Sequence, residues 1–142
     1  MNDIWVLVAD SSEARIFAAR NLRSSLDLVD TLTHAASRLH ARDLGSDVPG
    51  RVHDRFGPGR HSLDQGQQLK DTEKERFARE ISAYLAEGQR QKKLARLVVM
   101  AGPEFLGILR DSFGKPLAES VLAEVPKDLV AQDVAAIQTH LP

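Results

Sequence analysis

The chain has 142 residues, of which 42% are hydrophobic and 27% are charged, and its formal net charge at neutral pH is −1. This length predicts one globular domain over residues 1–142, and the hydrophobic fraction excludes a disordered chain. The absence of cysteine excludes disulfides, thiolate metal sites and cysteine nucleophiles, and a net charge near zero offers no overall field that would hold nucleic acid.

The first residues of the chain favour an intracellular protein. Met1-Asn2-Asp3 carries an acid where a signal peptide carries basic residues, and the apolar run that follows ends at Asp10. No apolar stretch reaches the roughly 18–20 residues that a membrane helix needs. We therefore expect a cytoplasmic protein that does not insert into a membrane.

Three strands are predicted at the start of the chain. Residues 4–9 form a continuous apolar run, typical of a strand buried on both faces, and Asp10-Ser11-Ser12 is typical of a turn. Residues 14–18 predict a second strand, and the alternation over residues 26–32 predicts a third that is half buried. Because the connections are short, we expect an antiparallel meander.

The middle of the chain has little apolar periodicity. Residues 35–44 are typical of a short helix with a thin apolar stripe. Residues 46–68 combine glycine and proline breakers with few large apolar side chains, and they predict a long flexible loop. Loops of this length are uncommon in compact domains and often carry function.

Helices and strands alternate in the second half of the chain. The capping box Thr72-Glu73-Lys74-Glu75 predicts the start of a helix that ends near Gly88. The remaining predicted elements are a strand over residues 94–101, a helix from Pro103, a strand over residues 120–125 and a helix capped by Asp128. The order β-β-β-α-β-α-β-α, a meander followed by βαβ units, predicts an α/β fold with a mixed sheet and helices on its faces.

Asp10 is a candidate for metal chemistry, because it follows the first strand at the sheet edge where α/β folds bind ligands. A two-metal site would need further carboxylates on neighbouring strands, and residues 98–102 contain none. We therefore interpret Asp10 as a turn residue that bonds the backbone near Ser12. Neither a metal nor another cofactor is expected.

An arginine-rich segment in the middle of the chain is a candidate for phosphate contacts, because the guanidinium fork bonds phosphate oxygens in pairs. Its arginines are Arg38, Arg42, Arg51, Arg55 and Arg60. The same segment contains His34, His40, His53 and His61, without the spacing of a histidine metal site. The alternative interpretation is a solvated loop whose charges only keep it in solution.

A second basic segment lies between Gly88 and Arg96 and contains Lys92 and Lys93. Together with Arg15, Arg20 and Arg23, it could form a surface stripe for an RNA backbone. The alternative is that these cations only favour the negative end of the preceding helix.

Five phrases spread over the chain carry a resemblance to a known family. They are WVLVADSSEARIF from Trp5, DLGSDVPGR from Asp43, LVVMAGPEFLG from Leu97, GKPL from Gly114 and PKDL from Pro126. Together they resemble the bacterial host attachment protein family, whose members are described as required for attachment to host cells. The resemblance covers nearly the whole chain.

That family in turn resembles the middle domain of archaeal and eukaryotic class-1 peptide release factors. The resemblance implies a ribonuclease-H-like mixed sheet, and it aligns the segment before the long helix with a catalytic loop that carries Gly-Gly-Gln. Glycines in that loop allow close backbone approach to the peptidyl-transferase centre. This chain has Gln65-Gly66-Gln67, so Gly66 and Gln67 are catalytic candidates by analogy, with Gln65 in place of the first glycine.

Three functions remain open at this point. The first is a binding module, not an enzyme, that contacts the ribosome or tRNA through the basic loop. The second is a peptidyl-tRNA hydrolase of release-factor type that uses Gln67 to position water. The third is a protein-interaction module or homo-oligomeric structural module. We favour the first, because the predicted loop is rich in arginine.

Overall fold

The computed structural model describes residues 3–34 and 59–142, with residues 59–70 described by their backbone only. The strands and helices in these ranges alternate much as the sequence predicts. In chain order they are β1 (Asp3–Ala9), β2 (Glu13–Ala19), β3 (Asp27–Thr33), α3 (Gly59–Arg90), β4 (Leu94–Ala101), α4 (Pro103–Ser112), α5 (Lys115–Glu119), β5 (Val121–Val125) and α6 (Val134–Thr139).

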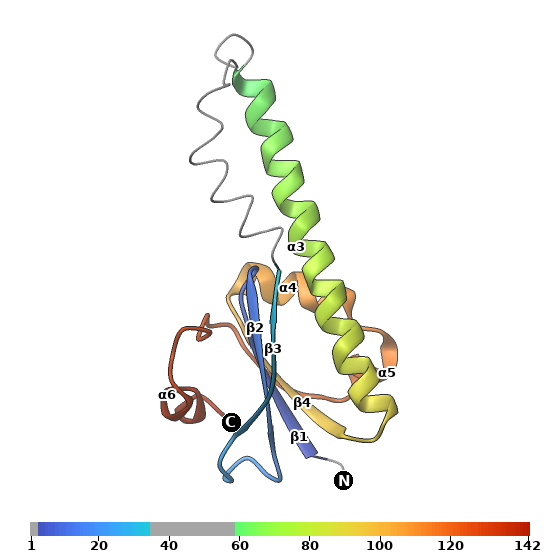
Figure 1. The fold of residues 1–142 in the computed structure, drawn as a ribbon, viewed down its shortest axis with the longest axis vertical. Helices are drawn as coiled ribbons and strands as arrows, with labels where there is room; N and C mark the ends of the chain where they lie inside the picture. Colours follow the sequence, from blue (N-terminus) through green and yellow to red (C-terminus); the bar gives the residue numbers. More distant parts are fainter. Residues whose placement is uncertain (1–2, 35–58) are drawn as a thin grey trace.

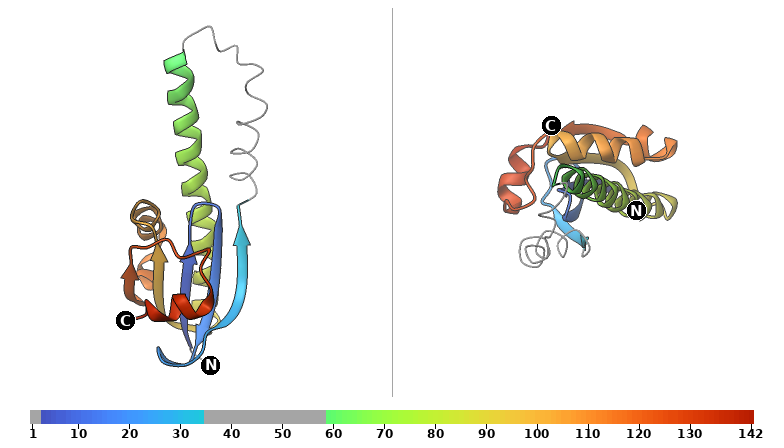
Figure 2. Two further views of the ribbon diagram at one scale, coloured as in Figure 1. Left: turned by 90° about the vertical axis from the view of Figure 1, so that its left-hand side faces the viewer. Right: turned by 90° about the horizontal axis from the view of Figure 1, so that it is seen from above.

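The strands form one mixed sheet in the order β3-β2-β1-β4-β5, seen nearly edge-on in Figure 1 and with its strands side by side in the left view of Figure 2. The first three are antiparallel neighbours, which confirms the predicted meander. The pairs β1–β4 and β4–β5 are parallel, with helices in the connections between them. The α/β class and the mixed sheet are therefore confirmed.

The sheet has a hydrophobic core on each face, and Figure 2 shows helices on both sides of it. Trp5 and Leu7 of β1 belong to the core under α3, α4 and α5, whereas Val6 and Val8 belong to the core under α6. Successive side chains of a strand point to opposite faces. The continuous apolar run of β1 follows from this central position, because both of its faces are buried.

Helix α3 is much longer than predicted, and it extends beyond the body of the molecule (Figures 1 and 2). Its buried side chains over residues 71–90 include Phe77, Ile81 and Leu85, spaced at four residues, which fixes this half on the sheet. No described helix is both long and apolar enough to cross a membrane.

The prediction of a flexible loop over residues 46–68 is wrong for residues 59–68, which belong to α3. The predicted start at Thr72 is wrong for the same reason, and the helix also continues past Gly88 to Arg90. Residues such as Gln67 and Leu69 favour helices, and extending an existing helix requires no new nucleus. The apolar stripe begins only where the helix reaches the sheet. The predicted helix over residues 35–44 and loop residues 46–58 lie outside the described ranges.

The C-terminal elements differ from the prediction in two details. Helix α5 was not expected, because it has only five residues and a single buried one, Leu117. Helix α6 is capped by Asp133, whose side chain accepts a hydrogen bond from Ala136 N at 2.8 Å, not by Asp128. The prediction for Asp128 is therefore wrong, since a loop separates β5 from α6.

The last turns of α3 approach β1 very closely at Gly88. A Cβ atom added at Gly88 would lie 2.6 Å from Cη2 and 2.8 Å from Cζ3 of Trp5, which is itself only 4% exposed. Glycine is therefore required at this position for the helix to sit on the indole ring.

We expect Gly88→Ala to lower the free energy of unfolding by about 1–3 kcal/mol, because the new methyl group overlaps the Trp5 ring. Gly107 provides the matched control, since it lies inside α4 and a Cβ there meets nothing within 4 Å. Gly107→Ala should stabilise the protein by about 0.5–1 kcal/mol through helix propensity. Urea unfolding measures both changes, and equal effects would contradict the close contact.

Candidate functional site

The predicted phosphate-binding residues separate into two groups that lie far apart. Lys92 and Lys93 follow the end of α3, whereas Arg60 lies in its first turn. With a rise of about 1.5 Å per residue, Arg60 is about 45 Å from Arg90 along the helix. One continuous patch cannot contain both groups. Arg38, Arg42, Arg51 and Arg55 lie outside the described residues.

Gly66 and Gln67, the predicted catalytic residues, lie within α3 and not in a loop. In the interior of an α-helix each backbone N–H donates to the carbonyl four residues earlier. The backbone at Gln67 is therefore engaged in the helix, in contrast to the loop backbone that the resemblance implies. Their catalytic role stays a prediction.

The register of the sheet brings Lys93 close to the end of β2. Asp3 N donates a hydrogen bond to Lys93 O at 3.0 Å, and its neighbour Ile4 pairs with Ala19, the last residue of β2. Arg20 follows Ala19 directly, at the same edge of the sheet. The turn after α3 and the turn after β2 are therefore neighbours in space.

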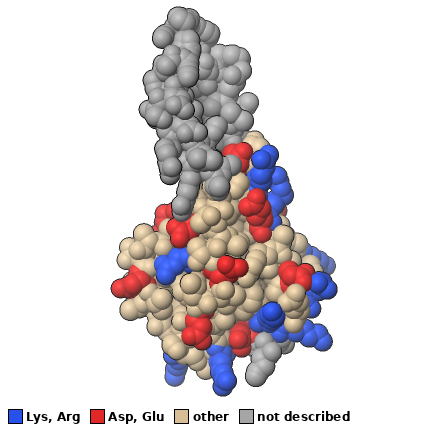
Figure 3. Space-filling model, viewed as in Figure 1, with Lys and Arg blue, Asp and Glu red and all other residues tan. Residues whose placement is uncertain are grey.

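This edge gathers cations from two segments of the chain, and we call them the basic end. Its members are Arg20, Arg23, Lys92, Lys93 and Arg96. All of them are exposed, and none forms an ion pair with a described residue. Figure 3 shows several Lys and Arg side chains, with acidic side chains between them, on the lower part of the molecule. Asp3 and Asp27 lie near the same edge, and Glu87, which is paired with Arg90, also attracts Lys93, so the five cations remain in excess.

The turn at Lys92 has an unusual backbone for a lysine. Lys92 N donates to Gln89 O and Lys93 N to Gly88 O, both at 2.9 Å, which is the Schellman pattern that ends many helices. The residue between the last helical turn and the strand adopts a left-handed conformation in this motif, and Lys92 has φ of 62°. Glycine usually occupies this position, because a side chain costs about 1–2 kcal/mol there. A retained strain of this kind is typical of functional positions.

Arg15, which the sequence placed in the same basic stripe, does not belong to the basic end. Its Nη1 donates to the carbonyl oxygens of Val130 and Gln132, at 3.0 and 2.8 Å. Its guanidinium also lies 5.1 Å from the ring centre of Phe17. Arg15 therefore holds the segment before α6 against the sheet, and the predicted stripe is wrong for this residue.

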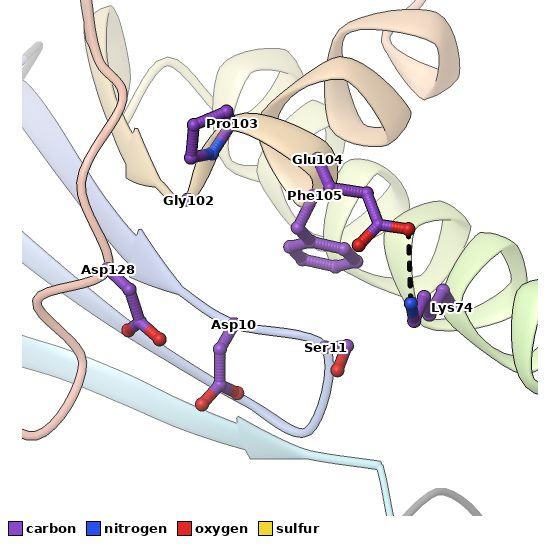
Figure 4. A pocket seen from close by; sticks show the side chains of 8 residues that line it. All are labelled: Asp10, Ser11, Lys74, Gly102, Pro103, Glu104, Phe105 and Asp128. Atoms are coloured by element: carbon purple, nitrogen blue, oxygen red, sulfur yellow. Dashed lines mark hydrogen bonds and ion pairs between the residues drawn. The ribbon is translucent and has the colours of Figure 1, made fainter.

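A hollow of about 230 Å³ lies at the opposite edge, after β1 and β4 (Figure 4). Asp10 lines it, and Asp10 Oδ1 accepts hydrogen bonds from Ser12 N and Glu13 N, each at 2.8 Å. This confirms Asp10 as a turn residue. Lys74 and Glu104 form an ion pair at 3.2 Å. Among the side chains of residues 3–34 and 71–142, no group of three metal-ligating residues is arranged to hold a metal ion.

His34 is buried, although the sequence grouped it with the cations of the loop. Its Nε2 lies 2.7 Å from Glu73 Oε1, and its ring stacks on Phe77 with centroids 5.2 Å apart. His34 N also donates to Ser12 O at 2.9 Å. The side chain thus joins the end of β3 to α3. Every second residue of β3 faces inward, and His34 follows the inward-facing Leu32 by two positions. This alternation was the sequence signal that His34 would be buried.

We expect Lys92→Gly to raise the free energy of unfolding by about 1 kcal/mol, because glycine adopts the left-handed conformation without a Cβ clash. Lys93→Gly is the control, since the two variants lose the same charge and Lys93 has no positive φ. Urea unfolding of both variants measures the difference. A Lys92→Gly protein no more stable than the Lys93→Gly protein would contradict the strained turn.

Comparisons with known proteins agree with the resemblance seen in the sequence. The family described as "Protein required for attachment to host cells" matches residues 5–141. The chain is also similar to the uncharacterized protein RP470 of Rickettsia prowazekii (strain Madrid E), with 28% identity over 137 residues. That alignment covers 94% of this chain and 83% of the relative. The chain therefore belongs to the family of proteins required for attachment to host cells.

Proposed function

We propose that this protein is a non-enzymatic binding module that contacts RNA of the translation machinery, ribosomal RNA or tRNA, through phosphate groups. The observation that carries the proposal is the basic end, in which five exposed cations from two segments form no ion pair with a described residue. Lysine and arginine at such a surface displace the counterions of RNA and bind its backbone. The chain resembles the middle domain of release factors, with its ribonuclease-H-like sheet. This resemblance is the reason to propose ribosomal RNA or tRNA as the ligand.

The strained turn supports the same conclusion. Lys92 occupies a position where glycine would be more stable, and its side chain projects from the surface beside Lys93. A protein under selection for stability alone gains by replacing this lysine. Its presence is explained if the side chain contributes a charge that a ligand needs.

The other two functions gain less support. A hydrolase of release-factor type needs a loop backbone at Gly66 and Gln67, and these residues are helical. A homo-oligomer could use the exposed Leu28 and Val29 at the edge strand β3. The register shift at Val29 and the acids Asp27 and Asp30, however, disfavour pairing with a further strand.

Charge removal at the basic end tests the proposed function. We expect Lys92→Ala/Lys93→Ala to weaken tRNA binding roughly tenfold and to reduce the salt dependence by about one to two counterions. Fluorescence anisotropy with labelled tRNA, titrated at several salt concentrations, measures both quantities.

The control is Arg79→Ala/Lys127→Ala, which removes two exposed charges away from the basic end. This variant has the same net charge as the double lysine variant, so any difference between them reports position. Equal tRNA affinities for the two variants, or no binding by the unaltered protein, would refute the proposed function.

A further inference from the structure

We infer that a groove beside the end of α3 receives an unpaired RNA base, so that the ligand is a single-stranded or looped segment. This inference rests on the proposed RNA-binding function and specifies its ligand. The groove lies between the last turns of α3 and the start of α5, with a volume of about 320 Å³. That is the lower end of the about 300–1,000 Å³ range of small-molecule pockets.

The walls of the groove combine an apolar floor with polar groups at the rim. Leu117 is buried beneath it, Ala86 and Pro116 supply aliphatic walls, and Gln89 and Arg90 lie at its edge. A flat apolar ring with polar edges fits such a site, because its faces prefer the aliphatic walls and its edge can reach the polar groups. An apolar ring fits this lining better than a phosphate does, since most of the lining is apolar.

The groove is continuous with the basic end. Gln89, at the rim, accepts a hydrogen bond from Lys92 N through its backbone carbonyl, and Gly88 O accepts one from Lys93 N. The last turn of α3 therefore lines the groove and leads directly into the two lysines. An RNA strand whose phosphates contact Lys92 and Lys93 passes its bases along the groove.

Arg90 presents a flat surface at this place. Its Nε donates to Glu87 Oε1 at 3.0 Å and its Nη2 to Glu87 Oε2 at 2.5 Å, while the side chain remains 73% exposed. Hydrogen bonds from Arg90, and then from Gln91, hold the pKa of Glu87 below its ordinary value, so the pair stays ionised. A guanidinium fixed in this way offers its plane for stacking on a base, and Glu87 offsets its charge.

Gln89 supplies a fixed polar group at the rim. Its Nε2 donates to Pro116 O at 3.0 Å, which orients the amide. The amide oxygen has no donor among the described residues, and it can accept a hydrogen bond from the edge of a base.

The occupant must be an unpaired base. In a duplex the bases are stacked inside the helix, and the deep, narrow major groove of A-form RNA keeps side chains away from them. A base can enter a groove between two helices only when it has left the stack. Stacking also does not depend on the base sequence, because every base has a flat face. The groove, whose walls are aliphatic, therefore needs no particular sequence.

The test compares two fluorescently labelled oligonucleotides of about ten nucleotides, one a single-stranded RNA and the other its abasic counterpart with the same phosphates. We expect the abasic probe to bind the full chain at least about fivefold more weakly, as loss of a stacked base predicts. Arg90→Lys keeps the charge but removes the plane, so it should abolish this difference and leave the salt dependence unchanged. Ala86→Leu, which fills the groove from an exposed helical position, should do the same.

Arg110→Lys is the matched control, because Arg110 also makes a two-bonded pair with a glutamate, Glu124, at 3.2 and 2.6 Å, away from the groove. It should leave the preference for the intact probe unchanged. Equal affinity for the intact and abasic probes would overturn the groove inference alone. If neither probe binds, the proposed RNA-binding function fails, and the inference fails with it.

Discussion

The close contact between Gly88 and Trp5 determines how α3 ends on the sheet. Because the helix lies directly on the indole ring, its last turn stops level with the amino ends of β1 and β4, and the chain must reverse within three residues. The Schellman turn makes this reversal, and it places Lys92 and Lys93 beside the start of β1. The position of the two lysines in the basic end is therefore a direct consequence of how α3 packs on the sheet.

The two edges of the sheet differ in what their charged groups do. At the carboxyl edge of the parallel strands, where α/β folds usually bind ligands, Asp10 bonds the backbone of its own turn and Lys74 pairs with Glu104. At the amino edge the cations of the basic end have no such partners among the described residues. The candidate site thus lies at the edge that fold class alone would not suggest. A charged side chain that already bonds another part of the protein is less available to bind a ligand than one without such a bond.

The sequence predicts the fold more completely than the site. The continuous apolar run of β1 and the alternation in β3 arise from burial, so both strands and the mixed sheet could be read from the pattern of residues. The first half of α3 could not, because its sequence offers no apolar stripe and contains Gly66. Lys92 and Lys93 stand out in the sequence as a basic pair, but their proximity to Arg20 depends on strand register, which no local pattern specifies. The roles of Arg15 and His34 also depend on contacts between distant segments. The residues next to Arg15 and His34 in the sequence therefore do not predict which distant groups these side chains bond.

RNA binding at the basic end is measured most directly by a map of the backbone amides that change on adding RNA, obtained from two-dimensional NMR spectra of the isotope-labelled protein. We expect the largest chemical-shift changes at Arg20, Arg23 and residues 88–96, with little change around Asp10 and Gly102. Changes concentrated at that opposite edge of the sheet, or no changes at saturating RNA, would contradict binding at the basic end.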